Sequence, residues 1–487
     1  MAGLRLPITR LPHRLDPDPG RVITKFFCPG DDARIRGVIG RIMGISDEMI
    51  TRLSRHLERD FRQRHPDIET IFKDNYEAVR RHLPDESSIS PERKLILGAY
   101  FTMEYAIESA ALFNPSMVPA EDQSGLPPGS TRFLMSLRAT GEGHISSIVF
   151  RRGTIDAECQ IHIEPRSPYT RQLRVIENRV FEKKVYRLKL IEMGGFTALA
   201  GEVLDRLAER FTFVDLNEAI EQIAAASAEP GASQETSENM ISLARSNYHL
   251  DLPEGVDPSE MVIFPSSENE SRGIEDLRLV RFCDDDGSAR YYGTYTAYNG
   301  FCILPQLLEI ADQRHVKVHT LSGRFAQNKG MALFPRRVNG SFLMISRLDN
   351  ENLFLMESDN VRFWNHAVMI QTPKYPWEIV QMGNCGSPLE TEAGWLLLTH
   401  GVGPMRQYCI GASLLDRDDP TRLIGRTEEP LLLPTGDERT GYVPNVVYSC
   451  GAMIHNDTLI IPYAMSDVST SFATVPLADL LRLLKGP

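Results

Sequence analysis

The sequence predicts a mainly β protein: a five-bladed β-propeller with an N-terminal α-helical region and a helical insertion. Two observations predict it. A strand–turn–strand unit recurs five times, and helical periodicity is confined to residues 46–113 and 172–245. The corresponding domains are residues 1–112, an arm followed by helices, and residues 113–487, the propeller that carries the insertion at about 172–245.

The N-terminal region begins with several prolines and little periodicity, so residues 1–30 are predicted to form an extended arm. Residues 46–65 (SDEMITRLSRHLERDFRQRH) predict a helix, with Ser46 as N-cap and acidic residues in the first turn. A second helix is predicted over residues 91–113, with Pro91 at its start, where the missing N–H costs nothing.

The insertion, residues 172–245, is predicted to be helical again on the segments EVLDRLAERF and LNEAIEQIAAASA. Residues 228–239 (AEPGASQETSEN) combine Pro, Gly, Ser and Asn, which predicts a loop or linker within it.

The five repeated units are RFLMSLRATGEGHISSIVF, YYGTYTAYNGFCILP, FLMISRLDNENLFLMES, WLLLTHGVGPMRQYCIGAS and LIIPYAMSDVSTSFATVP. The polar residues that close their first strands are Arg138, Thr296, Arg347, His400 and Ser466, spaced by 158, 51, 53 and 66 residues. If a blade takes about 50–60 residues, the first gap holds roughly 100 extra residues, most of them the insertion. Blades cover one another's apolar faces only when the ring closes. A β-sandwich, the competing architecture, does not explain the recurrence.

The bulk properties limit the partners. A net charge of -12 argues against a nucleic-acid surface. The cysteines are scattered without a CxxC pair, which predicts reduced thiols in a cytoplasmic protein. No apolar run approaches the ~20 residues of a membrane span, and the N-terminus lacks the apolar segment of a signal peptide. We therefore expect a cytoplasmic protein without nucleic-acid or membrane partners.

Polar residues at the same position of successive blades face one another on a propeller axis. The set comprises Arg138, Asp276, Lys329, Arg347, His400 and Asp467. Cations beside two acids, in an acidic protein, predict a pocket for an anion and a polyol.

His315 and His319 lie on one predicted strand and do not indicate a metal site. The motifs of nucleotide-binding loops and serine hydrolases do not occur.

Several segments resemble glycoside hydrolase family 130, which contains β-mannoside phosphorylases and β-1,2-mannosidases on a five-bladed propeller. They are GIEDLRLV, NKGMALFPRRVNGSFLMISR, GSPLETEAGWLLLTHGV, YCIGASLLDRDDPTRLIGRTEEPLLLP and GYVPNVVYSCGAMIHNDTLIIPYAMSD. The resemblance runs from about Phe113 to the C-terminus, interrupted by the insertion. Residues 1–110 have no counterpart in the family's shorter members.

The resemblance implies inverting phosphorolysis, in which inorganic phosphate is the co-substrate and no cofactor or metal takes part. Asp276 matches the proton donor, which in this family acts through a mannose hydroxyl, and Glu275 is expected to point elsewhere along the extended chain. The positions that match phosphate-binding residues are Lys329, Arg347, His400 and, as a further candidate, Tyr408. The positions that match mannose-binding residues are Asn114, Arg138 and Asp467.

Two departures from the family pattern stand at the site: Leu277 replaces a common Pro, and Ser346 replaces a common His. The family's hydrolases lack part of the basic phosphate-binding set, whereas this chain keeps it.

The resulting hypothesis is a β-mannoside phosphorylase acting on β-1,2-linked manno-oligosaccharides or mannosyl-glucose, which releases α-mannose 1-phosphate and makes β-mannosides in reverse. The alternatives are a β-mannosidase, a mannosyltransferase using a sugar nucleotide and a non-catalytic glycan-binding propeller. The added helices favour a homo-oligomer, against the simpler reading of a packed accessory domain.

Overall fold

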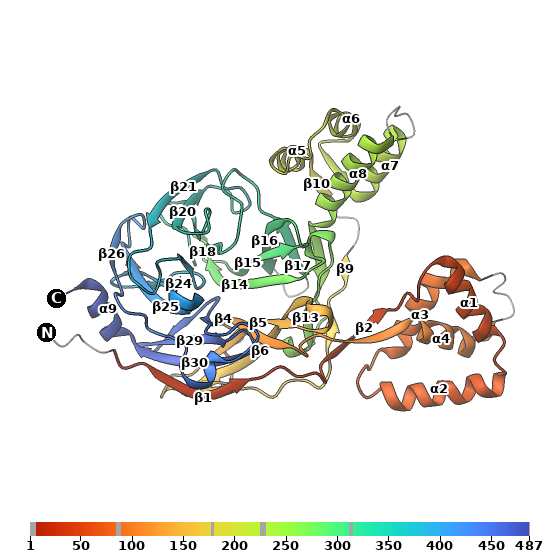
Figure 1. The fold of residues 1–487 in the computed structure, drawn as a ribbon, viewed down its shortest axis with the longest axis horizontal. Coiled ribbons are helices and arrows are strands. Elements are labelled where there is room, and N and C mark those ends of the chain that lie inside the picture. Colours follow the sequence, from red (N-terminus) through yellow and green to blue (C-terminus); the bar gives the residue numbers. More distant parts are fainter. Residues whose placement is uncertain (1–5, 84–88, 177–179, 225–229, 311–314, 487) are drawn as a thin grey trace.

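The computed structural model describes residues 6–83, 89–176, 180–224, 230–310 and 315–486, without side chains at 224 and 230–233. In this described part the chain is mainly β, as the sequence predicts. Its centre consists of five sheets of four or more strands (Figure 1).

The first two sheets surround the insertion in sequence. The first contains β4 (Ala111–Pro119), β5 (Thr131–Thr140), β6 (Ser146–Ile155), β13 (Met261–Ile263) and β8 (Arg171–Gln172), with β7 (Ile161–Ile163) paired to β6. The second contains β14 (Ile274–Cys283), β15 (Ala289–Tyr298), β16 (Ile303–Ile310), β17 (His315–Thr320), β12 (Tyr248–Asp251) and β9 (Val175–Ile176).

The other three sheets follow in chain order. The third contains β18 (Ala332–Leu333), β19 (Phe342–Ser346), β20 (Leu353–Ser358) and β21 (His366–Gln371). The fourth contains β22 (Gln381–Asn384), β24 (Gly394–Val402), β25 (Tyr408–Leu415) and β26 (Leu423–Arg426), with β23 (Leu389–Thr391) paired to β24. The fifth contains β27 (Val447–Tyr448), β29 (Thr458–Met465), β30 (Ser469–Pro476) and β1 (Thr9–Leu15), with β28 (Met453–His455) paired to β29.

Each predicted strand–turn–strand unit is an antiparallel hairpin, so the repeat is confirmed. The hairpins are β5–β6, β15–β16, β19–β20, β24–β25 and β29–β30. Nearly all residues of strands such as β19, β24 and β29 are buried, so these strands are covered on both faces, as strands between neighbouring sheets require.

Neighbouring sheets contact one another in a cyclic order. β4 contacts β14, β15 contacts β18, β19 contacts β22, β25 contacts β27, and β29 returns to contact β4. Each of these junctions is a shared hydrophobic cluster, which explains why no single sheet could fold alone. Representative buried pairs across the junctions are Phe150 with Leu279, Phe282 with Met344, Ile345 with Trp395, Ile410 with Ile461, and Phe133 with Phe472.

The N-terminal segment joins the sheets at two places that the prediction of an extended arm did not anticipate. β1 pairs antiparallel with β30 and extends the fifth sheet. β2 (Val22–Phe26) pairs with β3 (Thr102–Ala106) in a ribbon that leads to the N-terminal helices. In Figure 1 these helices project from the right-hand side of the sheets.

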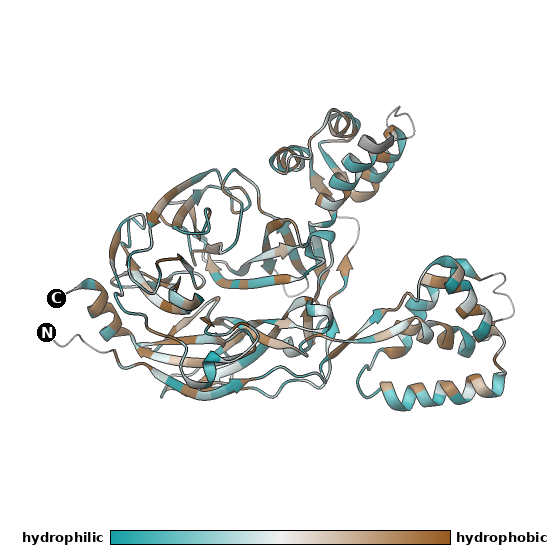
Figure 2. Cartoon of the chain, in the orientation of Figure 1, coloured by the Kyte–Doolittle hydropathy of each residue, from teal (hydrophilic) through white to brown (hydrophobic). Residues whose placement is uncertain are grey.

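The N-terminal helices are α1 (Asp32–Met43), α2 (Asp47–Phe61), α3 (Ile68–Val79) and α4 (Pro91–Tyr100). The predicted N-cap is confirmed, since Ser46 Oγ accepts a hydrogen bond from Met49 N. Figure 2 shows hydrophobic and hydrophilic bands alternating along α2, the pattern of a helix with one packed face. Ile50 of α2 is buried in the same cluster as Tyr76 of α3 and Ile96 of α4.

The helix predicted over residues 91–113 is too long, although Pro91 does occupy its first turn. α4 ends at Tyr100, because the chain then enters β3 and, from Ala111, β4. Thr102 Oγ1 donates to Gly98 O at 2.8 Å, and every residue of β3 is paired with β2. Pairing with a second strand outweighs the helical periodicity of this segment.

The insertion contains α5 (Lys183–Glu192), α6 (Ala198–Arg206), α7 (Phe213–Ala224) and α8 (Pro230–Arg245), with β10 (Val180–Glu182) paired to β11 (Arg210–Thr212). The loop predicted over residues 228–239 is wrong from residue 230 onward, where α8 begins; residues 228 and 229 lie outside the described part. Pro230 stands at the first position of α8, where a missing N–H is tolerated. Met240 and Leu243 of α8 are buried against Leu204 and Leu216, so packing overrides the polar composition.

The chain ends in α9 (Leu477–Lys485), whose Leu480 and Leu484 are buried against the fourth and fifth sheets. Leu6 and Ile8 pack on the same cluster, which brings the two ends of the described chain together (Figure 1). Among the described helices, none has the length and apolar character needed to cross a membrane.

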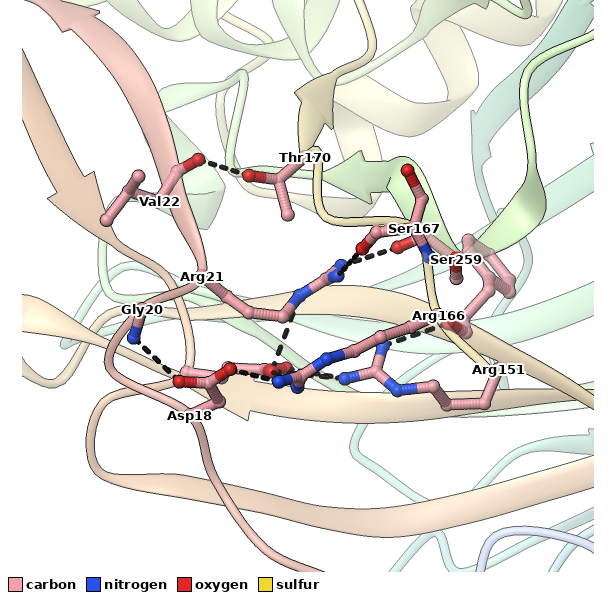
Figure 3. Close-up of polar contacts among 11 residues, drawn as sticks. Asp18, Gly20, Arg21, Val22, Arg151, Arg166, Ser167, Thr170 and Ser259 are labelled. Carbon is pink, nitrogen blue, oxygen red and sulfur yellow. Dashed lines mark hydrogen bonds and ion pairs between the residues drawn. The ribbon is translucent and has the colours of Figure 1, made fainter. Parts of the chain in front are cut away.

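A buried ion cluster locks the N-terminal segment onto the first sheet (Figure 3). Glu108 is fully buried and pairs with Arg151 at 3.1 Å, Arg21 at 3.4 Å and Arg166 at 3.6 Å. Arg21 also donates to Ser259 O at 2.5 Å. Burial and the nearby Arg151 lower the pKa of Arg21 to about 10, while burial raises the pKa of Glu108. The segment is therefore held by buried ion pairs, in which the loss of either partner would leave an uncompensated charge.

Candidate active site

The polar residues that close the first hairpin strands lie at one end of the sheets, next to the hairpin turns. Arg138 stands two residues before the end of β5, and His400 two residues before the end of β24. Arg347 directly follows β19, and Asp467 lies in the turn between β29 and β30. The starts of β4 and β14 face the same end, because Phe113 pairs with Arg138 and Glu275 with Thr296.

Asp276 occupies a bulge near the start of β14. The pairing with β15 slips between Glu275 and Arg278, and Asp276 has φ = 58°, in the left-handed region. A bulge of this kind turns a side chain out of the regular alternation. Gly273 allows the entry into this strand, since a Cβ there would lie 2.4 Å from Ser146 Oγ. The glycine of the GIED segment is thus required by a close approach to β6.

Asn114 occupies a second bulge, in β4, the strand beside β14. The pairing of β4 with β5 slips between Phe113 and Ser116, and Asn114 has φ = 49°. Its Nδ2 donates to Asp276 Oδ1 at 2.6 Å. Two neighbouring strands therefore use the same backbone device to bring an amide and a carboxylate together.

Arg138 connects the two acidic residues of the motif. It donates to Glu275 Oε1 at 3.2 Å and to Asp276 Oδ1 at 3.4 Å, and Lys329 Nζ lies 2.6 Å from Glu275 Oε2. The expectation that Glu275 points away is wrong, because the bulge at Asp276 removes the alternation on which it rested. The side chains are 15–32% exposed, so a ligand can reach them.

The two candidate aspartates differ in acidity. Burial by itself raises the pKa of Asp276, but Arg138, Arg278 and the hydrogen bond from Asn114 outweigh it and hold this pKa below 3.8. Burial and the nearby charge of Asp276 raise the pKa of Asp467 to about 6. Asp276 is therefore ionised in the free site near neutral pH, whereas Asp467 holds a proton up to mildly acidic pH.

Arg278 is a site residue that the sequence reasoning left without a role. It is buried and donates to Asp276 O at 2.9 Å, to Tyr448 Oη at 2.6 Å and to Asn384 Oδ1 at 3.2 Å. Its place two residues after Asp276 on a strand could have indicated it, but the partners Tyr448 and Asn384 come from other sheets. No local signal identifies them.

His400 has a defined tautomer. Its Nδ1 lies 3.2 Å from Asn384 O, a pure acceptor, so Nδ1 carries the hydrogen. Its Nε2 lies 3.4 Å from Arg347 Nη1, a pure donor, so Nε2 accepts. Burial, together with Arg347 and Arg278, lowers the pKa of His400 well below 6.5. His400 is therefore neutral in the free site and contacts Arg347, so Lys329 and Arg347 carry the positive charge among the residues predicted to bind phosphate. The contact of His400 with phosphate stays a prediction.

Tyr408 lies beside this pair. Its ring stacks on His400 with centroids 5.9 Å apart, and its hydroxyl accepts from Gln381 Nε2 at 3.3 Å. Gly383 pairs with His400 across β22 and β24 and leaves room for the imidazole, since a Cβ there would lie 2.3 Å from the ring.

Four buried polar atoms in this cluster lack a hydrogen-bond partner within the described residues: Asn114 Oδ1, Arg138 Nε, Ser346 Oγ and Arg347 Nε. Unpaired buried atoms are costly, and they are common where a ligand completes the bonding. The predicted residues thus fall into two adjoining groups. Asn114, Arg138, Asp276, Lys329 and Asp467 form the acidic group, and Arg347, His400 and Tyr408 form the other, joined to it through Asn384 and Arg278.

The chain is similar in sequence to β-mannoside phosphorylases. Residues 254–486 match a family model described as β-1,4-mannooligosaccharide phosphorylase of glycoside hydrolase family 130. The chain is 32% identical over 223 residues to a 1,2-β-oligomannan phosphorylase of Thermoanaerobacter sp. (strain X514), covering 45% of this chain and 73% of that protein. It is 29% identical over 265 residues to a β-1,2-mannobiose phosphorylase of Listeria innocua, covering 52% and 71%. A solved structure of the Listeria innocua β-1,2-mannobiose phosphorylase with β-1,2-mannobiose aligns with a TM-score of 0.45 at 18% identity, over 78% of this chain and 93% of that one.

Proposed function

The chain belongs to glycoside hydrolase family 130, the β-mannoside phosphorylase family, and on that premise we propose that it cleaves β-mannosides with inorganic phosphate. The proposed products are α-mannose 1-phosphate and the shortened sugar, and the reaction runs in reverse to make β-mannosides. The observation that carries this proposal is the contact of Asp276 with Asn114 and Arg138, next to the cations Lys329 and Arg347.

Each residue of the proposed site has its own part in the reaction. Asn114, Arg138 and Asp467 bind hydroxyls of the mannose, and Asp276 gives its proton, through a mannose hydroxyl, to the glycosidic oxygen. Phosphate, held by Lys329 and Arg347, attacks C1 from the opposite face. The C1–O bond to the leaving sugar breaks as the C1–O bond to phosphate forms, with inversion. Since the nucleophile is already anionic, no second carboxylate is needed as a base.

Asp276 must carry a proton to act as the donor, and we propose that bound phosphate raises its low pKa. In the free site Arg138 and Arg278 stabilise the carboxylate. A bound phosphate anion adds negative charge close to the cations and raises the pKa of Asp276, so that the carboxyl group takes up a proton. Proton donation then becomes available only when the nucleophile is present. His400 contributes by holding Arg347 for bidentate contact with phosphate.

The scaffold in this proposal is a five-bladed β-propeller, which the cyclic contacts of the five sheets support. Its catalytic domain comprises residues 113–487, with residues 1–112 and the helical insertion as additions that favour a homo-oligomer. Phosphate is the co-substrate, and no cofactor takes part.

The related proteins differ in the linkage that their descriptions name. The family model is described for β-1,4 linkages and the two relatives for β-1,2 linkages. Reverse synthesis tests it. The protein is incubated with α-mannose 1-phosphate and mannose, mannobioses or glucose as acceptor, and the new linkage is identified by NMR. We expect one β-mannoside product and release of phosphate. Absence of any product with all acceptors would contradict the proposal.

A further inference from the structure

The hairpin turns lie at the same end of the sheets as the candidate site, and two of them carry an exposed large side chain. Phe301 in the β15–β16 turn is 100% exposed, and Met405 in the β24–β25 turn is 88% exposed. Tyr442, in the loop that precedes β27, is 68% exposed. Large apolar side chains that remain on a surface beside a polar site are typical of ligand contact.

Tyr442 does not stand alone, because it stacks on His144 of the β5–β6 turn. Their ring centroids are 5.6 Å apart and the planes are inclined by 24°. The two rings come from separate loops, the turn of the first sheet and the loop that leads into the fifth, and together form a small aromatic platform. Gly143, with φ = 64°, and His144, with φ = 58°, give the turn a fixed left-handed shape.

The platform borders the residues proposed to hold mannose. Val443 N, next to Tyr442, donates to Ser466 O at 3.1 Å, and Ser466 precedes Asp467. The turn with His144 follows β5, the strand that carries Arg138. β4, with Asn114, runs between the two, since Leu112 N donates to Val468 O at 2.8 Å.

The loop that carries Tyr442 is also anchored. Glu438 accepts from Arg10 at 2.8 Å and from Tyr463 Oη at 2.6 Å, while Ser466 Oγ donates to Glu438 O at 2.6 Å. An aromatic ring on an anchored loop loses little conformational entropy when a ligand stacks on it. The platform is therefore preorganised to stack on the flat apolar face of a ligand.

We propose that the Tyr442–His144 platform is a binding subsite for a further sugar ring of the β-mannoside, beyond the bond that is cleaved. The inference rests on the proposed function and extends it to oligosaccharides. One face of a pyranose consists of C–H bonds and packs on an aromatic ring, while its hydroxyls face polar neighbours. The two rings offer this combination, since one stands on a loop bonded to Ser466, the neighbour of Asp467, and the other on the turn after β5, the strand of Arg138. A protein partner would need an interface of about 800 Å² per side, far larger than two rings.

The test measures binding as a function of sugar length, by calorimetry in phosphate-free buffer, on the full-length chain. All proteins carry Asp276→Asn, so that no turnover occurs, and the probes are mannobiose and mannotetraose in the β-1,2 and β-1,4 series. We expect the tetraose to bind about tenfold more tightly than the biose, in line with one additional stacked ring. Tyr442→Ala should remove this gain and leave the Kd of the biose within twofold.

The controls distinguish the loss of the stacking ring from misfolding of the variant. Tyr442→Phe keeps the ring and should keep the gain. His144→Ala should reduce the gain independently of Tyr442. An equal Kd for biose and tetraose, or an unchanged ratio in Tyr442→Ala, overturns the subsite while biose binding still supports the function. Absence of binding by either sugar contradicts the proposed function itself.

Discussion

Arg278 Nη1 donates to the backbone carbonyl of Asp276 at 2.9 Å, within the bulge that turns the Asp276 side chain into the site. The same guanidinium reaches Asn384, whose carbonyl fixes His400, which in turn accepts from Arg347. One buried arginine thus links the position of the proposed acid to that of the proposed phosphate ligands. The consequence is that both depend on a residue that touches no substrate.

We predict that Arg278→Lys lowers kcat about 100-fold, because one ammonium group cannot make the three separate contacts that hold the bulge and Asn384. Steady-state kinetics of mannobiose phosphorolysis measures it. The control is Arg281→Lys, three residues along the same strand and exposed, which should keep wild-type kinetics. Normal kcat in Arg278→Lys would contradict the positioning role.

We predict that His400→Gln keeps the KM for phosphate within about threefold, whereas His400→Ala raises it at least tenfold. A glutamine can still offer a neutral acceptor to Arg347, and the alanine cannot. Initial rates at varied phosphate concentration measure both. If the two variants lose phosphate affinity equally, His400 does not act as a neutral acceptor for Arg347.

We predict that Asp467→Asn stabilises the fold at pH 8 by about 1–3 kcal/mol. The folded pKa, about 6, exceeds the ordinary value of 3.8, so ionisation of Asp467 above pH 6 destabilises the native state. As the pH falls from 6 toward 3.8, both states become protonated and the gain disappears. Thermal unfolding at pH 5 and pH 8 measures the difference, and an equal Tm increase at both values would refute the assignment.

We predict that Glu108→Ala destabilises the protein by about 3–5 kcal/mol, because it leaves buried arginines without their counter-charge. Urea unfolding measures it. Asp16→Ala serves as the matched control, since its ion pair with Arg14 is about half exposed on both sides and should contribute under about 1 kcal/mol. Similar unfolding midpoints for the two variants would show that the cluster does not hold the N-terminal segment.

The hairpins could be predicted from sequence because each is a local pattern: apolar alternation, a turn, and alternation again. The residues at the strand ends followed from the repeat, and the proposed roles of Asp276 and Asn114 come from the family motifs. The strand β3 could not be predicted, because its partner β2 lies about 80 residues earlier and only that pairing overrides the helical periodicity of residues 102–106.

The rest of the site depends on contacts between sheets. The bulge at Asp276 reverses the expected direction of Glu275, and φ at a single residue is not visible in the sequence. The neutrality of His400 follows from burial and from Asn384 O, which lies 16 positions away in the chain but directly follows Gly383, the residue opposite His400 in the sheet. Arg278 lies two residues after Asp276 in the sequence, but its position in the site depends on a hydrogen bond to Tyr448, 170 positions later.

The measurement that tests the central claim most directly is the dependence of mannobiose cleavage on phosphate, followed by ³¹P and ¹H NMR. With β-1,2- or β-1,4-mannobiose and phosphate, we predict α-mannose 1-phosphate and mannose in equal amounts, no cleavage without phosphate, and no product from Asp276→Asn. Release of free mannose from both halves of the substrate, at the same rate with and without phosphate, would contradict the account.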